Sequence, residues 1–421
     1  MRGEQLAGPH PDAFRGRTIE YSAPPVVRDA IEALGRTEDV RFSPNNRRVA
    51  VAGFVRNRIT LFDIDIAASP AGSQIALTGA IELSSPSMKR PHGLDFIDDD
   101  TIIVANRAGD VAIFRLPAGE PGVRSLEVEP LQIWRAGEVN LVTSPGSVSV
   151  VRSGTDSCEI LVCNNYGHTV TRHALDLQDD CALGSSEVLL RKWLDVPDGV
   201  TVSHDRRWIA VSNHNTHSVL LYDNLPSLNE HSDPVSILRG VSYPHGLRFS
   251  SDGRYLLVAD AGAPDVHIYT RDGNDWGGVR DPESTIKVLD EAAFLRGHVN
   301  PQEGGPKGLD ISIDSTVLVV STEFQPLAFF DMPSMLARGD AQTARPDGAI
   351  DAPMDEHPPA LTRREQMALD VSRELRVREL ETRAGTAEAT VSSMTNSMSW
   401  RVTAPLRRLR SILPGPRSDP G

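Results

Sequence analysis

Two Pro-His-Gly tripeptides, at residues 91–93 and 244–246, place a histidine in the same local context twice. Carboxylates or a lysine take the matching position in similar segments, so a candidate ring comprises Glu38, His92, Asp198, His245 and Lys307. Imidazoles and carboxylates together can bind a divalent metal such as zinc or calcium, or transfer protons. A lysine beside them could stabilise an anionic intermediate. The alternative is that these charged side chains line a solvated channel and hydrogen-bond neighbouring turns.

A second set of polar side chains stands at the ends of apolar segments in the same units. This second ring comprises Asn106, Asn164, Asn213 and Asp260. Oxygen ligands of this kind suit a divalent cation such as Ca²⁺. The alternative is that they cap the turn that follows by bonding their own backbone. The loop residues His214, Asn215 and His217 leave the same two interpretations open.

The candidate residues occupy matching places in six repeated segments, each with strand-like runs separated by polar turns. The segments start at Thr37, Pro91, Pro145, Pro197, Pro244 and Pro306, at spacings of 54, 54, 52, 47 and 62 residues. Runs rich in β-branched residues at such a period are typical of β-propeller blades. Matching positions of successive blades converge on the central channel, and blades three apart face each other. We therefore expect His92 opposite His245.

The sequence thus predicts an all-β fold, a six-bladed β-propeller over residues 16–336, with a C-terminal α-helical tail. A lone sheet of three or four strands buries too little apolar surface to be stable, so neighbouring blades must stack. After a flexible N-terminus at residues 1–15, a strand near residues 16–22 is expected to fill the sixth blade and close the ring. A seventh blade between residues 272 and 305 stays an alternative.

Two segments carry a resemblance to known propellers. Residues 209–223, IAVSNHNTHSVLLYD, resemble the YVTN-type repeat, and residues 256–269, LLVADAGAPDVHIY, resemble the NHL repeat. The resemblance covers residues 37–333 and implies the fold rather than a function. In residue type the second ring is also similar to the metal ligands of calcium-dependent lactonases of the gluconolactonase and regucalcin type, although the motifs around those ligands are not evident.

From residue 337 onward the composition changes. Residues 337–360 are rich in Asp, Pro and Ala and are expected to form a linker. Residues 361–391 are expected to form an amphipathic helix that either pairs with another helix, as in a coiled coil, or lies on the propeller. A basic amphipathic segment follows at 392–413, and residues 414–421 are expected to be disordered. The residues of that segment expected to dock are Trp400, Arg401, Leu406, Arg407, Arg408, Leu409 and Arg410.

The 392–413 segment, SSMTNSMSWRVTAPLRRLRSIL, resembles the S-x-SWR-x-TAPLR tail of bacterial glycosyltransferases and methyltransferases of surface-polysaccharide assembly. The resemblance implies a place beside cell-envelope glycan synthesis. It implies no activity, because no catalytic domain of either kind accompanies the tail. Its arginines and apolar face suit an anionic membrane surface. Docking on a glycosyltransferase complex or on the chain's own propeller explains the same residues.

Composition and charge exclude some classes of partner and some cellular locations. The 421 residues include 43 Lys and Arg against 57 Asp and Glu, a formal charge of −14, which argues against nucleic acid as a partner. No apolar run reaches the roughly 20 residues of a membrane span, and the first residues lack the apolar core of a signal peptide. Cys158, Cys163 and Cys181 match no zinc pattern and indicate reduced thiols. We expect a cytoplasmic protein, peripheral at the inner face of the membrane through its tail.

The sequence therefore predicts a non-catalytic binding or scaffold protein associated with bacterial cell-surface polysaccharide biosynthesis. A protein partner or a glycan intermediate would bind at the propeller mouth, and no cofactor is established. The alternative is a metal-dependent lactonase or lyase whose active site lies at the same mouth.

Overall fold

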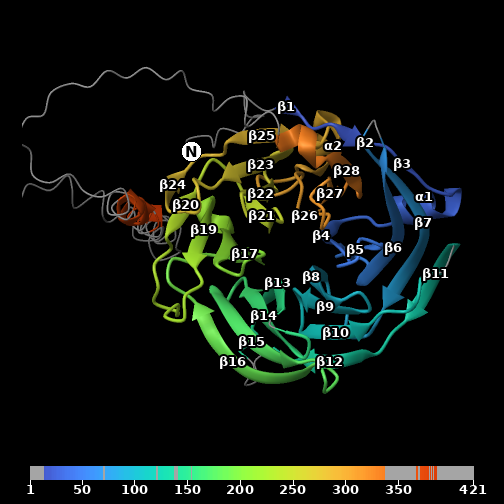
Figure 1. Cartoon of the computed structure of the whole chain (residues 1–421), viewed down its shortest axis with the longest axis horizontal. Helices are drawn as coiled ribbons and strands as arrows, with labels where there is room; N and C mark the ends of the chain where they lie inside the picture. Colours follow the sequence, from blue (N-terminus) through green and yellow to red (C-terminus); the bar gives the residue numbers. More distant parts are fainter. Residues whose placement is uncertain are drawn as a thin grey trace, which may run out of the picture. The chain divides into compact units, whose positions relative to one another are not determined.

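Six β-sheets stand around a central channel as the blades of a propeller (Figure 1). This computed structural model describes residues 14–69, 72–119, 122–136, 141–152 and 154–336, together with 367, 370–378, 380, 382 and 384–385 near the C-terminus. The six-bladed, mainly β architecture predicted from the repeats is thereby confirmed.

Each blade contains at least four strands, described here from the channel outward. Blade 1 comprises β4 (Thr37–Phe42), β5 (Arg48–Gly53), β6 (Arg58–Ser69) and β7 (Gly72–Ser84). Blade 2 comprises β8 (Pro91–Asp98), β9 (Thr101–Asn106), β10 (Val111–Arg115) and β12 (Pro130–Trp134). Blade 3 comprises β13 (Pro145–Arg152), β14 (Ser157–Asn164), β15 (Thr169–Asp176) and β16 (Ala182–Leu190).

The second half of the ring follows the same plan. Blade 4 comprises β17 (Pro197–Val202), β18 (Trp208–Asn213), β19 (Ser218–Asp223) and β20 (Ser236–Leu238). Blade 5 comprises β21 (Pro244–Phe249), β22 (Tyr255–Asp260), β23 (Asp265–Thr270) and β25 (Ser284–Lys287). Blade 6 comprises β26 (Gly308–Ile311), β27 (Val317–Ser321), β28 (Ala328–Asp331) and, from the N-terminus, β2 (Thr18–Ile19).

Residues 272–305, where a seventh blade was the alternative, form no further sheet in the described part of the chain. Their first strand, β24 (Gly278–Arg280), joins the outer edge of blade 4 by parallel pairing with β20. Their second strand, β25, belongs to blade 5. The helix α2 (Glu291–Gly297) follows, and its N-terminus is capped by the Asp290 side chain, which accepts a hydrogen bond from the backbone of Ala293.

A short N-terminal strap, residues 14–22, ties three neighbouring blades together at their outer edges. Its first strand, β1 (Phe14–Arg15), pairs parallel with β25 of blade 5. Next, β2 pairs antiparallel with β28 of blade 6, and β3 (Tyr21–Ser22) pairs parallel with β7 of blade 1. Blade 2 adds a similar hook, because its β11 (Gly122–Glu127) pairs parallel with β7. These pairings cover strand edges that would otherwise be open to other chains.

The core lies between adjacent blades rather than within one layer. The second strands of blades 1, 2, 4 and 5 are buried along their whole length. Separate apolar clusters join blades 1 and 2, 2 and 3, 4 and 5, and 5 and 6, and a further cluster joins blades 6 and 1 beneath α1 (Pro25–Glu32). Neighbouring blades therefore stack on one another, as the repeated segments predicted.

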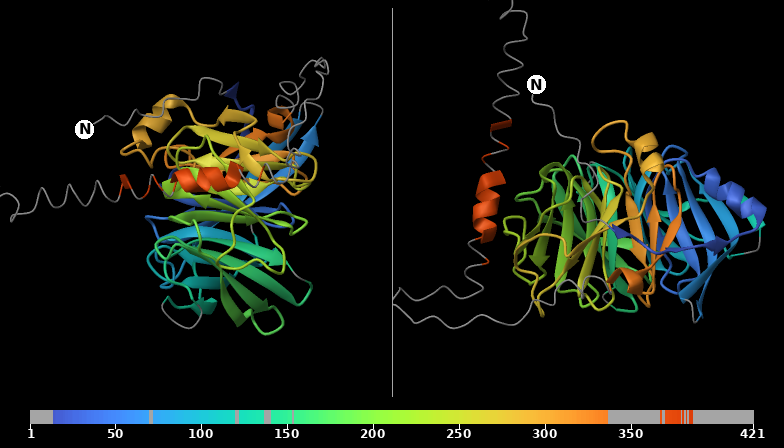
Figure 2. Two further views of the ribbon diagram at one scale, coloured as in Figure 1. Left: turned by 90° about the vertical axis from the view of Figure 1, so that its left-hand side faces the viewer. Right: turned by 90° about the horizontal axis from the view of Figure 1, so that it is seen from above.

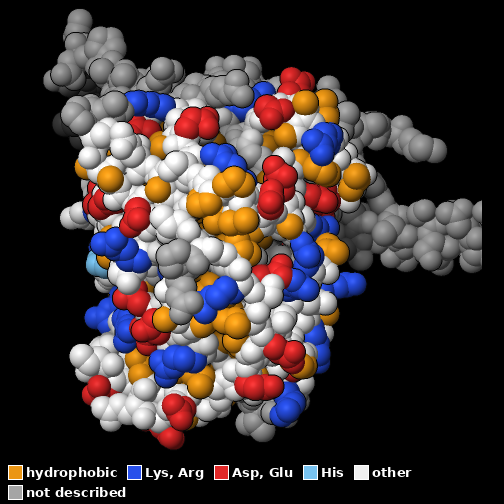
Figure 3. Space-filling view, turned by 90° about the vertical axis from the view of Figure 1, so that its right-hand side faces the viewer, with side chains coloured by type: hydrophobic (Ala, Val, Ile, Leu, Met, Phe, Trp, Pro, Cys, Tyr) orange, Lys and Arg blue, Asp and Glu red, His pale blue; other side chains and the backbone are white. Residues whose placement is uncertain are grey.

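Two further views show the depth of the ring and α2 at its rim (Figure 2). The outer surface is mixed in charge on the side that Figure 3 shows. On the side that carries β11, acidic and basic side chains are interspersed with apolar ones, without a broad field of one sign (Figure 3).

Near the C-terminus the structure places a helix that includes residues 370–378. Its pairing in a coiled coil stays a prediction. The expected linker at 337–360 and the basic segment at 392–413, with all seven docking residues, lie outside the described residues. Among the helices that the structure describes, none is both long and apolar enough to cross a bilayer.

Candidate functional site

The first ring lies where the innermost strands begin. Glu38, His92, Asp198 and His245 stand at the starts of β4, β8, β17 and β21, and Lys307 directly precedes β26. All five side chains are buried, with at most 7% of each residue exposed. The structure therefore brings the five candidate residues together at the channel axis.

A glycine follows four of these residues, all but Glu38, and it is needed there because the innermost strands approach one another closely. A Cβ atom on Gly199 would lie 2.3 Å from the backbone oxygen of His245, and one on Gly246 would lie 2.5 Å from the backbone oxygen of Lys307. The Pro-His-Gly segments are the first residues of β8 and β21. Only glycine leaves room for the next blade there.

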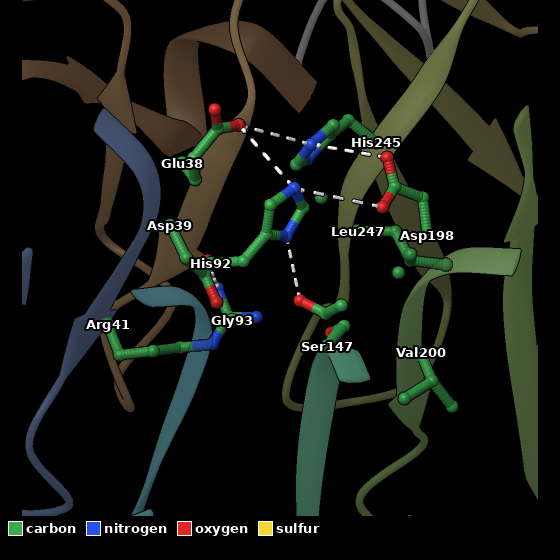
Figure 4. Close-up of a pocket in the computed structure, with 13 residues that line it drawn as sticks. Glu38, Asp39, Arg41, His92, Gly93, Ser147, Asp198, Val200, His245 and Leu247 are labelled. Atoms are coloured by element: carbon green, nitrogen blue, oxygen red, sulfur yellow. Dashed lines mark hydrogen bonds and ion pairs between the residues drawn. The ribbon is translucent and has the colours of Figure 1, made fainter. Parts of the chain in front are cut away.

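Two imidazoles and two carboxylates face one another across the axis (Figure 4). The His92 and His245 ring centroids are 5.1 Å apart. Glu38 Oε2 lies 3.7 Å from His92 Nε2 and 3.5 Å from His245 Nε2. Asp198 lies 3.3 Å from His245 Nε2 through Oδ2 and 4.0 Å from His92 Nε2 through Oδ1. Both Nε2 atoms are thus within 4.0 Å of two carboxylates.

Backbone carbonyls fix the orientation of both imidazoles. His92 Nδ1 is 2.7 Å from the carbonyl oxygen of Gly146, and His245 Nδ1 is 3.0 Å from that of Lys307. Because a carbonyl oxygen can only accept, each Nδ1 carries a proton and donates it. In the neutral rings, each Nε2 therefore presents its lone pair toward the axis.

Cations from the surrounding loops balance the carboxylates. Arg36 Nε is 2.6 Å from Glu38 Oε1, and Arg36 Nη2 is 3.0 Å from Glu303. Lys307 Nζ lies 2.7 Å from Glu303 and 3.2 Å from Glu38 Oε2. Arg107 Nη2 lies 3.1 Å from His92 Nε2 and 3.5 Å from an Asp198 oxygen.

This balance keeps both carboxylates ionised. Burial acts to raise the pKa of Glu38, but Lys307, His245 and His92 outweigh it and hold that pKa well below its usual value. Burial likewise acts to raise the pKa of Asp198, and His245 with Arg107 lowers it strongly. The throat of the channel therefore holds two anionic side chains.

The two histidines differ in their protonation. Burial, reinforced by the positive charge of Arg107, lowers the pKa of His92 to about 3, so this imidazole is neutral near pH 7. Burial also acts to lower the pKa of His245, but Asp198 and Glu38 outweigh it and raise that pKa. His245 is thus the imidazole that more readily carries charge.

The second ring positions the first. In each of four blades its side-chain oxygen accepts a hydrogen bond from the backbone N–H two residues before the proline that starts the innermost strand. The pairs are Asn106 with Lys89, Asn164 with Thr143, Asn213 with Asp195, and Asp260 with Ser242, at 2.9, 2.9, 2.6 and 2.7 Å. These oxygens anchor the loops that lead to the channel. Asn106 and Asp260 also bond the turn that follows, as the alternative expected: Asn106 Nδ2 donates to the backbone oxygen of Asp110 at 2.9 Å, and Asp260 accepts from the Gly262 N–H at 3.0 Å.

The histidine loop after β18 lies at the rim of the mouth. His214 is buried and its Nδ1 lies 3.7 Å from Asp198 Oδ2. His217 is exposed, hydrogen-bonds the backbone oxygen of Ser242 and packs against Tyr243 with ring centroids 4.7 Å apart. Asn215 donates to Asp195, 3.1 Å away. Of the three loop residues, only His214 reaches the ring.

A deeper layer of charge was missed from the sequence. Three residues beyond the first ring position, Arg41, Asp95, Arg248 and Asp310 face the channel below it. Arg248 lies 2.9 Å from Asp310 and 3.6 Å from Asp95. Burial raises the pKa of Asp95 to about 7 and that of Asp310 to about 6. Each of these carboxylates also accepts a backbone N–H from the next blade, Asp95 from Val150 and Asp310 from Phe42.

The rim residues Arg36, Arg107, Asn165 and Glu303 were also missed. Asn165 donates a hydrogen bond to Asp198, and the other three pair with the ring as described. All four come from loops. Arg107 and Asn165 directly follow the second-ring residues Asn106 and Asn164, a recurring place that the sequence could have signalled, whereas Arg36 and Glu303 were signalled only by their charge. The three cysteines, expected as reduced thiols, are free and buried.

The mouth above the ring combines arginines with aromatic rings. The guanidinium carbon of Arg36 is 4.9 Å from the ring centroid of Phe54, and that of Arg90 is 5.7 Å from the same centroid. Arg107 stands 5.3 Å from the ring centroid of Tyr166, which is 68% exposed. Below them, the cavity at the ring leaves only about 10 Å³ for the centre of a water molecule, room for about one water.

Comparison with known proteins gives no family for the chain: no protein-family model matches it, and no curated protein matches it either. The function must therefore be inferred from the geometry of the channel and its mouth.

Proposed function

We propose that this propeller is a binding module that takes an anionic ligand at the mouth of its channel. The observation that carries the proposal is the set of arginines stacked on aromatic rings at the mouth, with Arg36 and Arg90 on Phe54 and Arg107 on Tyr166. A guanidinium beside an aromatic ring can bind a carboxylate or phosphate through two parallel hydrogen bonds. The exposed Arg90 is the best placed to do so, whereas Arg36 and Arg107 also pair with carboxylates of the ring and with Glu303.

Binding at the mouth fits the channel better than a reaction inside it. The space at the ring holds about one water, so an organic substrate would not reach His92 or His245 without the ring opening. The carboxylates there are already paired with cations. The half-buried Arg107 and the exposed Tyr166 are accessible from solvent.

An anionic glycan intermediate is the ligand class that we favour. Aromatic faces such as Tyr166 and Phe54 can stack on sugar rings, and the arginines beside them would bind a uronic acid or a phosphate. The 392–413 segment, with its resemblance to tails from surface-polysaccharide assembly, supports the same class. A protein partner is the other candidate occupant.

Titration of the full chain with a uronic-acid oligosaccharide and with a neutral one of equal length tests this proposal. We expect heat of binding only for the acidic sugar, and a loss of at least about tenfold in affinity in Arg107→Gln and in Tyr166→Ala. Arg47→Gln is the matched control, because Arg47 is 72% exposed and pairs with Asp65 away from the mouth. Equal affinity for both sugars, or equal loss in the control, would refute it.

We further propose that the tail holds the protein at the inner face of the membrane or in a glycosyltransferase complex. Each arginine near an anionic surface contributes about 1 kcal/mol, so the four of the basic segment give reversible attachment. Flotation with anionic liposomes should carry the full chain but not a version ending at Pro359. Equal flotation of both versions would remove the membrane from the proposal.

A metal-dependent lactonase or lyase is the second candidate, because two imidazoles and two carboxylates meet at the axis. Lactone hydrolysis by the zinc-loaded chain, lost in His92→Gln, would favour this enzyme. No turnover by the loaded chain would dismiss it.

A further inference from the structure

We infer that the throat of the channel is a zinc-class metal site formed by Glu38, His92, Asp198 and His245. The inference is independent of the ligand proposed for the mouth. Two ligands of one tetrahedral Zn²⁺ ion, bonded at about 2.0–2.1 Å, lie roughly 3.3 Å apart. The ligand atoms of Glu38, His92 and His245 all lie within 4.8 Å of one another, with Glu38 Oε2 3.7 and 3.5 Å from the two Nε2 atoms. Asp198 approaches His245 Nε2 through Oδ2 at 3.3 Å and His92 Nε2 through its other oxygen, Oδ1, at 4.0 Å. Small shifts of Glu38, His92 and His245 would bring three ligands around one ion, and a rotation of Asp198 would supply the fourth.

The histidines are prepared for such a role. Each donates its Nδ1 proton to a backbone carbonyl, Gly146 for His92 and Lys307 for His245. This arrangement fixes the tautomer that leaves Nε2 free to bind metal, and it holds the ring in place. A channel that only holds water would not need two opposed imidazoles that are each oriented by a backbone carbonyl.

One carboxylate oxygen still lacks a hydrogen bond. Glu38 Oε2 is buried and accepts none, whereas Glu38 Oε1 accepts one from Arg36. A buried carboxylate oxygen without a donor is costly, and a metal ion would satisfy it. The donor set of two nitrogens and two carboxylates suits zinc and its neighbours. Calcium prefers oxygen ligands alone.

Arg107 would compete with a metal ion for the same position at the axis. Its Nη2 lies 3.1 Å from the His92 Nε2 lone pair that a metal would use, and its Nη1 is buried without a hydrogen-bond partner. Because the same guanidinium stacks on the exposed ring of Tyr166, it can withdraw toward the mouth and keep that contact. Lys307 Nζ lies 2.7 Å from Glu303 and 3.2 Å from Glu38 Oε2, so metal binding would also require Lys307 to turn toward Glu303.

Such an ion would join blades 1, 2, 4 and 5 at the axis. Binding to the folded chain alone would then raise the unfolding temperature with metal concentration. The removal of Arg107 should have the opposite effect to removal of a ligand, because a positive charge a few ångströms from the ion is eliminated. That difference separates a metal site from a purely structural charge cluster.

The test uses the untagged full chain, stripped with chelator and titrated calorimetrically with ZnCl₂ and, separately, with CaCl₂. We expect one Zn²⁺ per chain and a higher unfolding temperature, with no response to Ca²⁺. His92→Gln and His245→Gln should weaken zinc binding by about a hundredfold or more, as expected for loss of a ligand. His231→Gln, a change at an 84% exposed histidine, should leave it unaltered.

Arg107→Met is the second variant, and it tests the metal site even if His92→Gln and His245→Gln fail to fold. It should bind zinc about tenfold or more tightly. No zinc bound by either the original chain or Arg107→Met would overturn the inference, as would zinc binding unchanged in His92→Gln and His245→Gln. Loss of zinc binding in His231→Gln alone would place the ion elsewhere and overturn it as well.

Discussion

Gly246→Ala should disturb stability and the throat together. The added Cβ would lie 2.5 Å from the backbone oxygen of Lys307, about 0.9 Å short of ordinary contact. That oxygen belongs to blade 6 and accepts hydrogen bonds from both Gly246 N–H and His245 Nδ1, at 2.8 and 3.0 Å. The atoms nearest to the added Cβ all belong to the backbone, so blades 5 and 6 would have to move apart to make room for it. We expect a loss of about 2–3 kcal/mol, toward the upper end for overpacking.

Thermal unfolding followed by circular dichroism measures this effect. For a domain of about 320 residues, about 2–3 kcal/mol corresponds to a fall of roughly 3–5 °C in Tm. The matched control is Gly184→Ala in β16, an exposed strand position where the Cβ would meet the backbone oxygen of Ala174 at 3.4 Å. That change should be neutral, or stabilising by up to about 1 kcal/mol. A Tm for Gly246→Ala within about 1 °C of the original chain would refute the close packing on which the reasoning depends.

Three further predictions follow from the strap, from His92 and from the cysteines. A chain lacking residues 1–22 should unfold at lower urea than one lacking residues 1–12, because only the first loses the strap; equal midpoints would contradict a closing role. Since the pKa of His92 falls from 6.5 unfolded to about 3 folded, its contribution to stability is complete above pH 6.5 and is lost as the pH falls toward 3. Between pH 7 and 4.5, His92→Gln should therefore lose about 2–3 kcal/mol less than the original chain, as urea midpoints would show; equal losses would refute the burial of a neutral ring. Burial raises the pKa of Cys158 to about 12, and all three cysteines are buried, so a thiol reagent at pH 8 should label none in the folded chain and three after unfolding; rapid labelling of the folded chain would contradict this.

The repeat made the blades predictable because stacking forces the same strand into the same surroundings six times. The apolar run at β9 and the run at β22 differ in sequence, yet both are buried from end to end. Because matching positions of the blades meet at the channel axis, His92 and His245 could also be expected to face each other. A burial pattern that recurs from blade to blade can be seen in the sequence even when the residues themselves differ.

The partners of the ring were not predictable in this way. Arg107 sits at a recurring place, because it directly follows Asn106 as Asn165 follows Asn164, but the residue types there differ and spacing does not fix where a loop side chain points. The layer around Arg248 does recur at a fixed offset from the ring and could have been found by the same alignment of segments. The role of the second ring depends on which backbone N–H lies near each side chain, as between Asn213 and Asp195. Spacing alone does not contain that information.

The strap also sets the order in which the protein can be completed during its synthesis. Ile19 pairs with Phe329, so the closing strand leaves the ribosome about 310 residues before its partner. At roughly 5–20 residues per second, that interval is on the order of 15–60 s. Throughout it, the inner apolar faces of the first and latest blades have no neighbour across the gap. A nascent chain of this kind needs its earliest strands kept from pairing elsewhere, which makes its yield depend on the pace of translation and on the chaperones at hand.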